Sequence, residues 1–349
     1  MGVLEVVACG PLTSIQDHGR IGLARLGIPR SGAMDALSLE LANALVGNAP
    51  GEAAIELAWM GLTLRAHAAP VTLSVTGVPA HVRRGGRDGA AHATIVLQPG
   101  EVLDVGRAER GVFMYVAAGG GFEIVPVLAS RSLYARGAIG GLDGRRLAAG
   151  DRLAVRAAAT EWSGGVASDP VPIVASPMLR VLPGPEAALF TTDAIAAFMS
   201  SAYTVTDLCD RMAYRLSGPT LQRGVGGDLV STGTVPGAVQ VPPDGQPLVL
   251  MADCQTVGGY PRIATVVSAD LRWLAQCRPG AAVRFEAIDM DEAHRILRAE
   301  RARQWCLRSR PAQATGSAGS SDSYARLAAC TDYVTDGLDP SSWMRQFDM

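Results

Sequence analysis

The 349-residue sequence predicts a mainly β protein with a few helices, organised in barrel-like or sandwich-like domains. Two observations lead to this fold class. The 40 glycines and 21 prolines interrupt the chain every few residues, which is typical of short elements joined by turns. Between them lie strand-length apolar runs rich in valine, isoleucine and threonine, namely VTLSVTG, ATIVL, VFMYVAAG, PLVLMAD and RIATVVSAD.

Three segments have the composition of helices. In residues 35–48 the leucines recur at helical spacing after Asp35, a residue type suited to a helix N-cap. The other two candidate helices cover residues 185–201 and 291–310. With so few helices, the strands must supply most of the core.

A faint internal repeat suggests two related β subdomains. A Gly-Gly-aromatic triplet at 120–122 is followed by the apolar run IVPVL (124–128), and another at 258–260 is followed by IATVV (263–267). Both copies follow an apolar strand and lead to a glycine-containing turn and a closing strand. In both copies a serine lies eight residues after the aromatic and a leucine eleven. We therefore expect an N-terminal β subdomain over 1–165, a C-terminal one over 166–310, and a linker with a short tail over 311–349. The tail either docks on a groove of this chain or of a partner, or is a disordered end.

The overall composition excludes several classes of protein. The net charge is −2, with 48% hydrophobic residues, so the chain lacks the basic balance typical of nucleic-acid or anionic-membrane binding. No apolar run is long enough for a membrane helix, and the N-terminus does not resemble a signal peptide. A cytoplasmic location is the expectation.

The placing of cysteine and histidine and the lack of lysine argue against several kinds of site. The six cysteines are scattered without C-x-x-C spacing and the five histidines form no ligand pair, so we expect no disulfide scaffold and no metal site. The sequence contains no lysine. A Schiff-base lysine, a Walker-A lysine and covalent biotin on this chain are therefore excluded.

Polar, glycine-bearing clusters interrupt the β pattern and are expected on loops, where binding and catalytic groups concentrate. Each could also serve only as a turn, and Arg211 and Arg215 could simply pair with surface acids. Asp253 is harder to explain structurally, because it directly follows an apolar strand. The four clusters cover residues 17–35, 129–147, 209–219 and 236–261.

Together these clusters offer acids, amides, hydroxyls and arginines, a set suited to an amide or ureido substrate. No adjacent nucleophile and base pair supports a hydrolase triad. In our hypothesis the first cluster forms a wall of the substrate site, the fourth completes it, and Arg20 holds an anionic group. The candidate catalytic residues are Asp17, His18 and Asp253. The candidate substrate-binding residues are Arg20, Ser31, Gly32, Asp35, Gln240, Asp244, Gln246, Gln255, Thr256 and Tyr260.

Six ordered motifs across about residues 3–308 resemble a known family. They are DHGRIGLARLGIPRSGAMD, LANALVGN, AAIEL…GL, SRSLYARGAIGGLDGRRLAAGD, DRMAYRL and PGAVQVPPDGQPLVLMADCQTVGGYPRIATVVSADL. The chain resembles the KipA-like family of biotin-dependent carboxyltransferases, also called allophanate hydrolase subunit 2, which includes the C component of 5-oxoprolinase. Ala213 stands where the family usually has glycine, and Leu133 where it has threonine or serine.

The resemblance implies a fold, partners and cofactors. The fold is two cyclophilin-like β-barrel subdomains, in agreement with the internal repeat. The partners are a KipI-like protein (allophanate hydrolase subunit 1, or the B component of 5-oxoprolinase) and a LamB/YcsF-like protein (its A component). ATP would be shared with those partners, and any biotin would be carried by another chain.

The family spans two chemistries, so the function has alternatives. The leading hypothesis is a subunit of an ATP-dependent 5-oxoprolinase, which hydrolyses a lactam to glutamate. The first alternative is the carboxyltransferase component of a biotin-dependent urea or amide carboxylase. The second is a non-enzymatic KipA-like antagonist of a kinase inhibitor.

Overall fold

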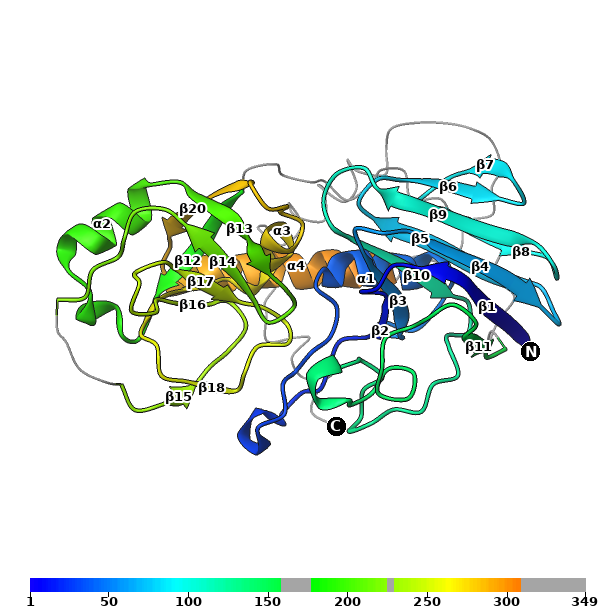
Figure 1. The fold of residues 1–349 in the computed structure, drawn as a ribbon, viewed down its shortest axis with the longest axis horizontal. Coiled ribbons are helices and arrows are strands. Elements are labelled where there is room, and N and C mark those ends of the chain that lie inside the picture. The colour runs from blue at the N-terminus through cyan, green and yellow to red at the C-terminus, as the bar shows by residue number, and fades with distance from the viewer. Residues whose placement is uncertain (158–176, 225–228, 309–349) are drawn as a thin grey trace, which may run out of the picture.

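The computed structural model describes residues 1–157, 177–224 and 229–308. Figure 1 shows two β-rich halves side by side, joined across the middle by helices. The predicted tail, 311–349, and the predicted boundary at residue 165 lie outside the described residues. No helix in the described ranges is long and apolar enough to cross a membrane.

The N-terminal half contains two antiparallel sheets that enclose one core. Strands β1 (Gly2–Cys9) and β4 (Leu62–His67) alternate buried and partly exposed residues, so each places one face on that core. Leu4, Leu64, Ile55 and Met114 lie in it and are fully buried. The first sheet runs in the order β11 (Arg152–Val155), β1 (Gly2–Cys9), β4 (Leu62–His67), β9 (Val102–Ala108), β6 (Ala80–Arg84) and β7 (Arg87–Gly89). The second sheet runs in the order β2 (Ser14–Gln16), β3 (Ala54–Ala58), β10 (Phe113–Ala118), β5 (Val71–Gly77) and β8 (Thr94–Leu97).

Strand β10 is buried on both faces, which explains its unbroken apolar sequence. Met114 and Val116 face the N-terminal core, whereas Phe113 and Tyr115 belong to a second core that continues into the other half. Helix α1 (Ala36–Leu45) covers this second face, and Asp35 caps it by accepting a hydrogen bond from Ser38 N.

The C-terminal half is a closed seven-stranded barrel. It closes through a parallel pairing of β12 (Met178–Pro183) with β20 (Ala282–Ala287), in which Met178 lies opposite Arg284. Phe198, Tyr203 and Phe285 make stacked and edge-on contacts within its core. The barrel order is β12 (Met178–Pro183), β19 (Arg262–Val266), β16 (Ala238–Gln240), β17 (Leu248–Leu250), β14 (Ala213–Ser217), β13 (Tyr203–Cys209) and β20 (Ala282–Ala287).

Short elements complete the fold. Helix α4 (Met290–Arg308) crosses the middle of the molecule and packs on α1 (Figure 1). A two-stranded ribbon joins β15 (Thr232–Gly233) to β18 (Val257–Gly258). The remaining helices are α2 (Thr192–Ser200), α3 (Leu271–Ala275) and α4 (Met290–Arg308). The 3-10 turns are η1 (Ala24–Leu26), η2 (Ala135–Gly137), η3 (Ala187–Leu189) and η4 (Ser268–Asp270).

The predicted mainly β fold is confirmed, and all five quoted apolar runs contain strands. The candidate helix at 185–201 is divided, because Phe190 is extended and Thr191 caps a new helix through Ala194 N. The internal repeat is only partly matched. Residues 262–266 form β19, but the corresponding run at 124–128 is not a strand and makes a single isolated bridge.

Candidate functional site

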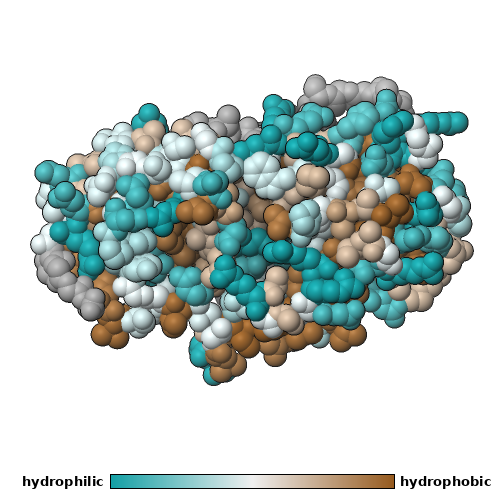
Figure 2. All heavy atoms as spheres, viewed as in Figure 1, coloured by the Kyte–Doolittle hydropathy of each residue, from teal (hydrophilic) through white to brown (hydrophobic). Residues whose placement is uncertain are grey.

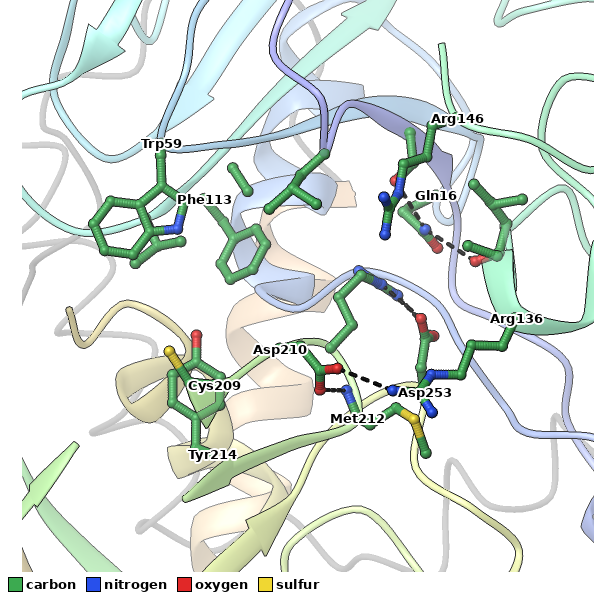
Figure 3. A pocket seen from close by; sticks show the side chains of 17 residues that line it. Gln16, Trp59, Phe113, Arg136, Arg146, Cys209, Asp210, Met212, Tyr214 and Asp253 are labelled. Carbon is green, nitrogen blue, oxygen red and sulfur yellow. Dashed lines mark hydrogen bonds and ion pairs between the residues drawn. The ribbon is translucent and has the colours of Figure 1, made fainter. Parts of the chain in front are cut away.

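A pocket lies at the junction of the two halves, with a wall from each (Figure 3). It encloses about 790 Å³ between atoms, part of which is open to solvent. The N-terminal wall consists of Leu12, Ser14, Gln16, Ala58, Trp59, Val112, Phe113, Leu133, Ala135, Arg136 and Arg146. The C-terminal wall consists of Cys209, Asp210, Arg211, Met212, Tyr214 and Asp253.

Arg211 joins the two walls. Its Nε and Nη2 donate to the two carboxylate oxygens of Asp253, at 2.9 and 3.0 Å. Its Nη1 donates to Glu56 on β3, and its Nη2 also donates to the carbonyl of Gly32 at 2.5 Å. Burial alone would lower the pKa of Arg211, but Asp253 and Glu56 outweigh burial and raise it. Arg211 is therefore a fixed cation with two acidic partners.

Glu56 continues the network into the N-terminal half. Its Oε2 accepts hydrogen bonds from Met34 N at 2.9 Å and from the Tyr115 hydroxyl at 2.8 Å. Burial raises the pKa of Glu56, although Arg211 acts in the opposite direction. Burial, followed by the charges of Glu56 and Asp35, raises the pKa of Tyr115 well above 10. Tyr115 therefore stays a neutral donor to Glu56.

The same network returns to the C-terminal half through Asp35. Its backbone N–H donates to the Tyr115 hydroxyl at 2.8 Å. Its carboxylate accepts from Arg272 Nε at 3.2 Å and from Gln276 Nε2 at 3.0 Å. Gln276 Oε1 accepts from the backbone N–H of Phe113 at 2.8 Å. Buried polar side chains from each half thus form hydrogen bonds to the other half.

Asp17 ties the first polar cluster to the second. Its carboxylate accepts from the hydroxyls of Ser130 and Ser132 and from the backbone N–H groups of Arg131 and Gly19, at 2.5–2.7 Å. Burial would raise the pKa of Asp17, but these four hydrogen bonds outweigh burial and hold the pKa below 3.8. This arrangement fixes the loop, and Asp17 is not among the residues that line the pocket.

Arg20 points into the protein and is only 2% exposed. Its Nε donates to Val127 O at 3.2 Å and its Nη2 to Ser132 O at 2.6 Å. Burial lowers the pKa of Arg20, with Asp17 and Asp253 acting in the opposite direction. The guanidinium therefore holds loop carbonyls, where the sequence suggested a contact with an anionic substrate group.

The rest of the first cluster lies along the subdomain junction. His18 Nε2 is 3.1 Å from Glu40 Oε1, outside the pocket lining. Ser31 has a positive φ of 57°, and its backbone N–H donates to Ala252 O at 3.0 Å. The next residue, Gly32, supplies the carbonyl for Arg211. The first and fourth clusters thus meet beside Asp253, as the hypothesis of a shared wall requires.

The other fourth-cluster candidates do not line the pocket. Asp244 pairs with Arg215 at the surface, and Gln246 bonds both ways with the Gly218 backbone at 2.9 and 3.2 Å. Gln255 donates to Gln240 at 3.2 Å. Thr256 accepts a backbone hydrogen bond from Thr234, and Tyr260 is half exposed. Their substrate-binding roles remain predictions.

Sequence reasoning missed the most connected group in the site. Pairing with surface acids was the alternative considered for Arg211, and the structure contradicts it, because its partners Glu56 and Asp253 are buried. Sequence reasoning also did not identify Gln16 and Glu56 as candidate site residues. A single acid inside the apolar strand AAIELA was the available clue to Glu56, because an unpaired charge is rarely left in a core. Among the described residues, no three potential ligands are grouped to hold a metal.

The fold and site define a class of protein in which two β subdomains share a core and form a pocket at their junction. Residues 26–287 match the family described as carboxyltransferase domain, subdomain A and B, and the chain belongs to this family. The resemblance noted from the motifs is therefore confirmed.

Curated relatives differ in how much of their length this chain covers. It is 36% identical to the C component of 5-oxoprolinase from Haemophilus influenzae, over 85% of this chain and 94% of that protein. It is 28% identical to urea amidolyase of Saccharomyces cerevisiae, over 84% of this chain but 17% of that much longer protein.

Solved structures also differ in the share of their length that this chain covers. The Kluyveromyces lactis urea amidolyase superposes with a TM-score of 0.81 at 26% identity, covering 91% of this chain and 20% of that chain. The protein TTHA0988 superposes with a TM-score of 0.74 at 35% identity, covering 82% of this chain and 56% of that chain. In these proteins the fold seen here is one part of a longer polypeptide.

Proposed function

We propose that this chain is the C component of an ATP-dependent 5-oxoprolinase, which converts 5-oxoproline, ATP and water to glutamate, ADP and phosphate. The observation that carries the proposal is the 36% identity that spans nearly all of the Haemophilus influenzae C component. The chain would act with a KipI-like B component and a LamB/YcsF-like A component, and ATP would be bound jointly with them.

The pocket has groups suited to a small anionic lactam. The Oε1 of Gln16 is buried and has no hydrogen-bond partner within the described ranges, and a lactam N–H would satisfy it. Arg136, which is exposed, and Arg146 lie on the same wall and can receive the substrate carboxylate. Asp253 faces the pocket from the opposite wall as the candidate catalytic acid or base.

The network around Arg211 explains how Asp253 would be oriented. Two parallel hydrogen bonds from the guanidinium fix the plane of the carboxylate, and Glu56 and Gly32 fix the guanidinium. A carboxylate held in this way needs little reorganisation during proton transfer. Arg211 is therefore a positioning residue, because most of its N–H groups already donate to Asp253, Glu56 and Gly32.

Reconstitution tests the proposal. The purified chain is assayed for 5-oxoproline-dependent release of ADP and glutamate, alone and with the KipI-like and LamB/YcsF-like proteins. Proline, which lacks the lactam carbonyl, serves as the control substrate. We expect almost no turnover by the chain alone and turnover by the complete mixture. Full activity of the isolated chain would contradict the subunit role, and an inactive complete mixture would contradict the reaction.

A second candidate function is carboxyl transfer to urea or another amide. It is supported by the superposition on Kluyveromyces lactis urea carboxylase, with a TM-score of 0.80 over 91% of this chain. Because this chain has no lysine, a separate chain would have to carry biotin. Avidin-sensitive incorporation of bicarbonate into urea, in the presence of a biotin carboxylase and a carrier, would favour this function. Partner binding with neither activity would favour the KipA-like antagonist.

A further inference from the structure

Gln16 carries a buried hydrogen-bond acceptor that no group in the described part of the chain satisfies. Its side chain is fully buried on β2 and lines the pocket. The amide nitrogen donates to the Ser14 hydroxyl at 3.0 Å and to the carbonyl of Leu133 at 3.2 Å, which uses both of its N–H groups. The amide oxygen, Oε1, has no hydrogen-bond partner among the described residues. Because buried acceptors are normally paired, this oxygen is available to a ligand.

The amide of Gln16 cannot turn over to present its N–H groups to the pocket. A rotation by half a turn would bring Oε1 against the carbonyl oxygen of Leu133, and two acceptors would then face each other without a hydrogen. Leu133 is itself fixed, because its backbone N–H donates to Ile15 O at 2.9 Å. In Figure 3, dashed lines mark both hydrogen bonds of Gln16, on the side of the pocket that also carries Arg136 and Asp253.

Gln16 differs in this respect from the other polar side chains of the pocket. Arg211 and Asp253 form hydrogen bonds to each other. Asp210 accepts a hydrogen bond from Met212 N at 2.7 Å. Of the buried side-chain atoms without a partner in the described ranges, Oε1 of Gln16 is the only one whose residue lines the pocket. The pocket therefore has a fixed acceptor that a bound ligand has to match.

We propose that Gln16 is a specificity-determining residue, whose amide oxygen selects ligands that carry an N–H group. The class of ligand is then a lactam, a urea or another amide. An N–H group satisfies the buried oxygen, whereas a methylene in its place leaves the oxygen unpaired and a ring oxygen brings a second acceptor against it. The choice of 5-oxoproline as the main probe rests on the proposed function, but the requirement for an N–H group applies equally to urea.

Ligand binding tests this requirement without turnover. The full chain, alone and mixed with the KipI-like and LamB/YcsF-like proteins, is titrated by calorimetry in the absence of ATP. The first ligand pair is 5-oxoproline and 3-oxocyclopentane-1-carboxylate, which keeps the ring size, carbonyl and carboxylate but has a methylene in place of the N–H group. The second pair, 2-pyrrolidinone and cyclopentanone, repeats the comparison without a carboxylate. In each pair we expect the lactam to bind at least about tenfold more tightly.

A variant assigns this preference to Gln16. Gln16→Met has a side chain of similar length without an acceptor, and it should reduce the preference to less than about threefold by weakening lactam binding. Gln98→Met is the matched control and should keep the wild-type preference, because Gln98 is exposed and does not line the pocket. The comparison of ligands on the wild-type chain needs no variant, so it decides the matter even if Gln16→Met does not fold.

The inference is overturned if the wild-type protein binds the two ligands of each pair equally, or if folded Gln16→Met keeps the preference. Absence of lactam binding in both preparations would also overturn it. If the lactams bind with the expected preference but the complete mixture never hydrolyses 5-oxoproline, the role of Gln16 stands and the proposed reaction fails. If the mixture hydrolyses 5-oxoproline while both pairs bind equally, the reaction stands and the role of Gln16 fails.

Discussion

Arg215 and Arg211 each form ion pairs with carboxylates, but one pair is at the surface and the others are in the interior, where they matter more for stability. Arg215 pairs with Asp244 where both are accessible to water, and such a pair contributes little. The partners of Arg211 are almost fully buried, so removing Arg211 would leave two buried carboxylates without a cation. Asp253 is the only candidate catalytic residue from the sequence that lines the pocket.

The first prediction concerns Asp253→Asn. This change keeps the side-chain volume but removes the charge opposite Arg211, so the complete enzyme should lose more than about tenfold in 5-oxoproline-dependent ATP cleavage. Asp88→Asn is the matched control, because Asp88 is exposed and does not line the pocket. Circular dichroism of both variants checks folding. Wild-type turnover in folded Asp253→Asn would remove this carboxylate from the proposed chemistry.

The second prediction concerns Asp17→Asn and pH. The folded-state pKa of Asp17 lies below 3.8, so folding favours its ionised form. Its stabilisation is present above about pH 4 and is lost as the pH falls through the folded-state pKa. The variant should lose about 2–4 kcal/mol of unfolding free energy at pH 7, because several buried hydrogen bonds are removed or inverted. Urea unfolding between pH 7 and pH 3 should show a shallower acid dependence than wild type; an unchanged dependence would refute the assigned role.

At the scale of elements, the segment between β10 and β11 is the least regular part of the N-terminal half. It contains only η2 and isolated bridges over more than thirty residues, yet it contributes to the pocket wall and exposes apolar side chains such as Val125. In Figure 2, brown spheres gather along the lower edge of the molecule over this segment. Its order comes from hydrogen bonds to β2 and to Asp17 and Arg20, such as Leu133 N to Ile15 O at 2.9 Å. A long loop fixed in this manner is typical of a functional element.

The third prediction tests this fixation with two glycines. Gly140 has a φ of 73°, and a Cβ there would overlap Ser132 O and Arg20 Nη2. Gly100 has a φ of 87°, and a Cβ there would meet nothing within 4 Å. Gly100→Ala should cost about 1–2 kcal/mol of stability for the left-handed backbone alone. Gly140→Ala should cost a further 1–3 kcal/mol or so through overpacking. Chemical unfolding measures both losses of unfolding free energy. Equal losses in the two variants would show that Ser132 and Arg20 move to accept a Cβ at position 140.

At the scale of the whole molecule, the two subdomains are not independent. One buried cluster contains Leu39 and Tyr115 of the N-terminal half together with Leu216 and Phe285 of the barrel. The polar network through Arg211, Asp35 and Gln276 crosses the same junction. Separating the halves would expose apolar surface and leave buried charges without partners.

The fourth prediction follows from this shared core. Scanning calorimetry should show one cooperative unfolding transition for the whole chain, because the second core takes side chains from both halves and is exposed when either half unfolds. Tyr115→Phe, which removes a hydroxyl from the junction network, should lower that transition without splitting it, at a cost of about 1–3 kcal/mol. Two well-separated transitions in the wild-type chain would refute the coupling.

The sequence predicted strands and helices best where neighbouring residues alone determine the element. Asp35 followed by spaced leucines identified α1 and its cap, and the apolar runs identified β5, β8 and β10. It misjudged 185–201, where the capping hydroxyl of Thr191 starts a new helix. It also suggested an equivalence between 124–128 and 262–266 that the hydrogen bonding does not support, because only the latter has strand partners on both sides.

What the sequence alone determined is the mainly β fold class, the absence of lysine chemistry and the four polar clusters that surround or adjoin the site. These depend on residue type and spacing, which are local properties. The tertiary structure decided which clusters meet and which polar groups face outward. Arg211 and Glu56 are 155 positions apart in the chain, and whether a charged side chain is buried with a partner or solvated depends on what the fold brings beside it. The same physical reason sends the charges of Asp17 and Arg20 inward to order the loops, and leaves Asp253 facing the pocket.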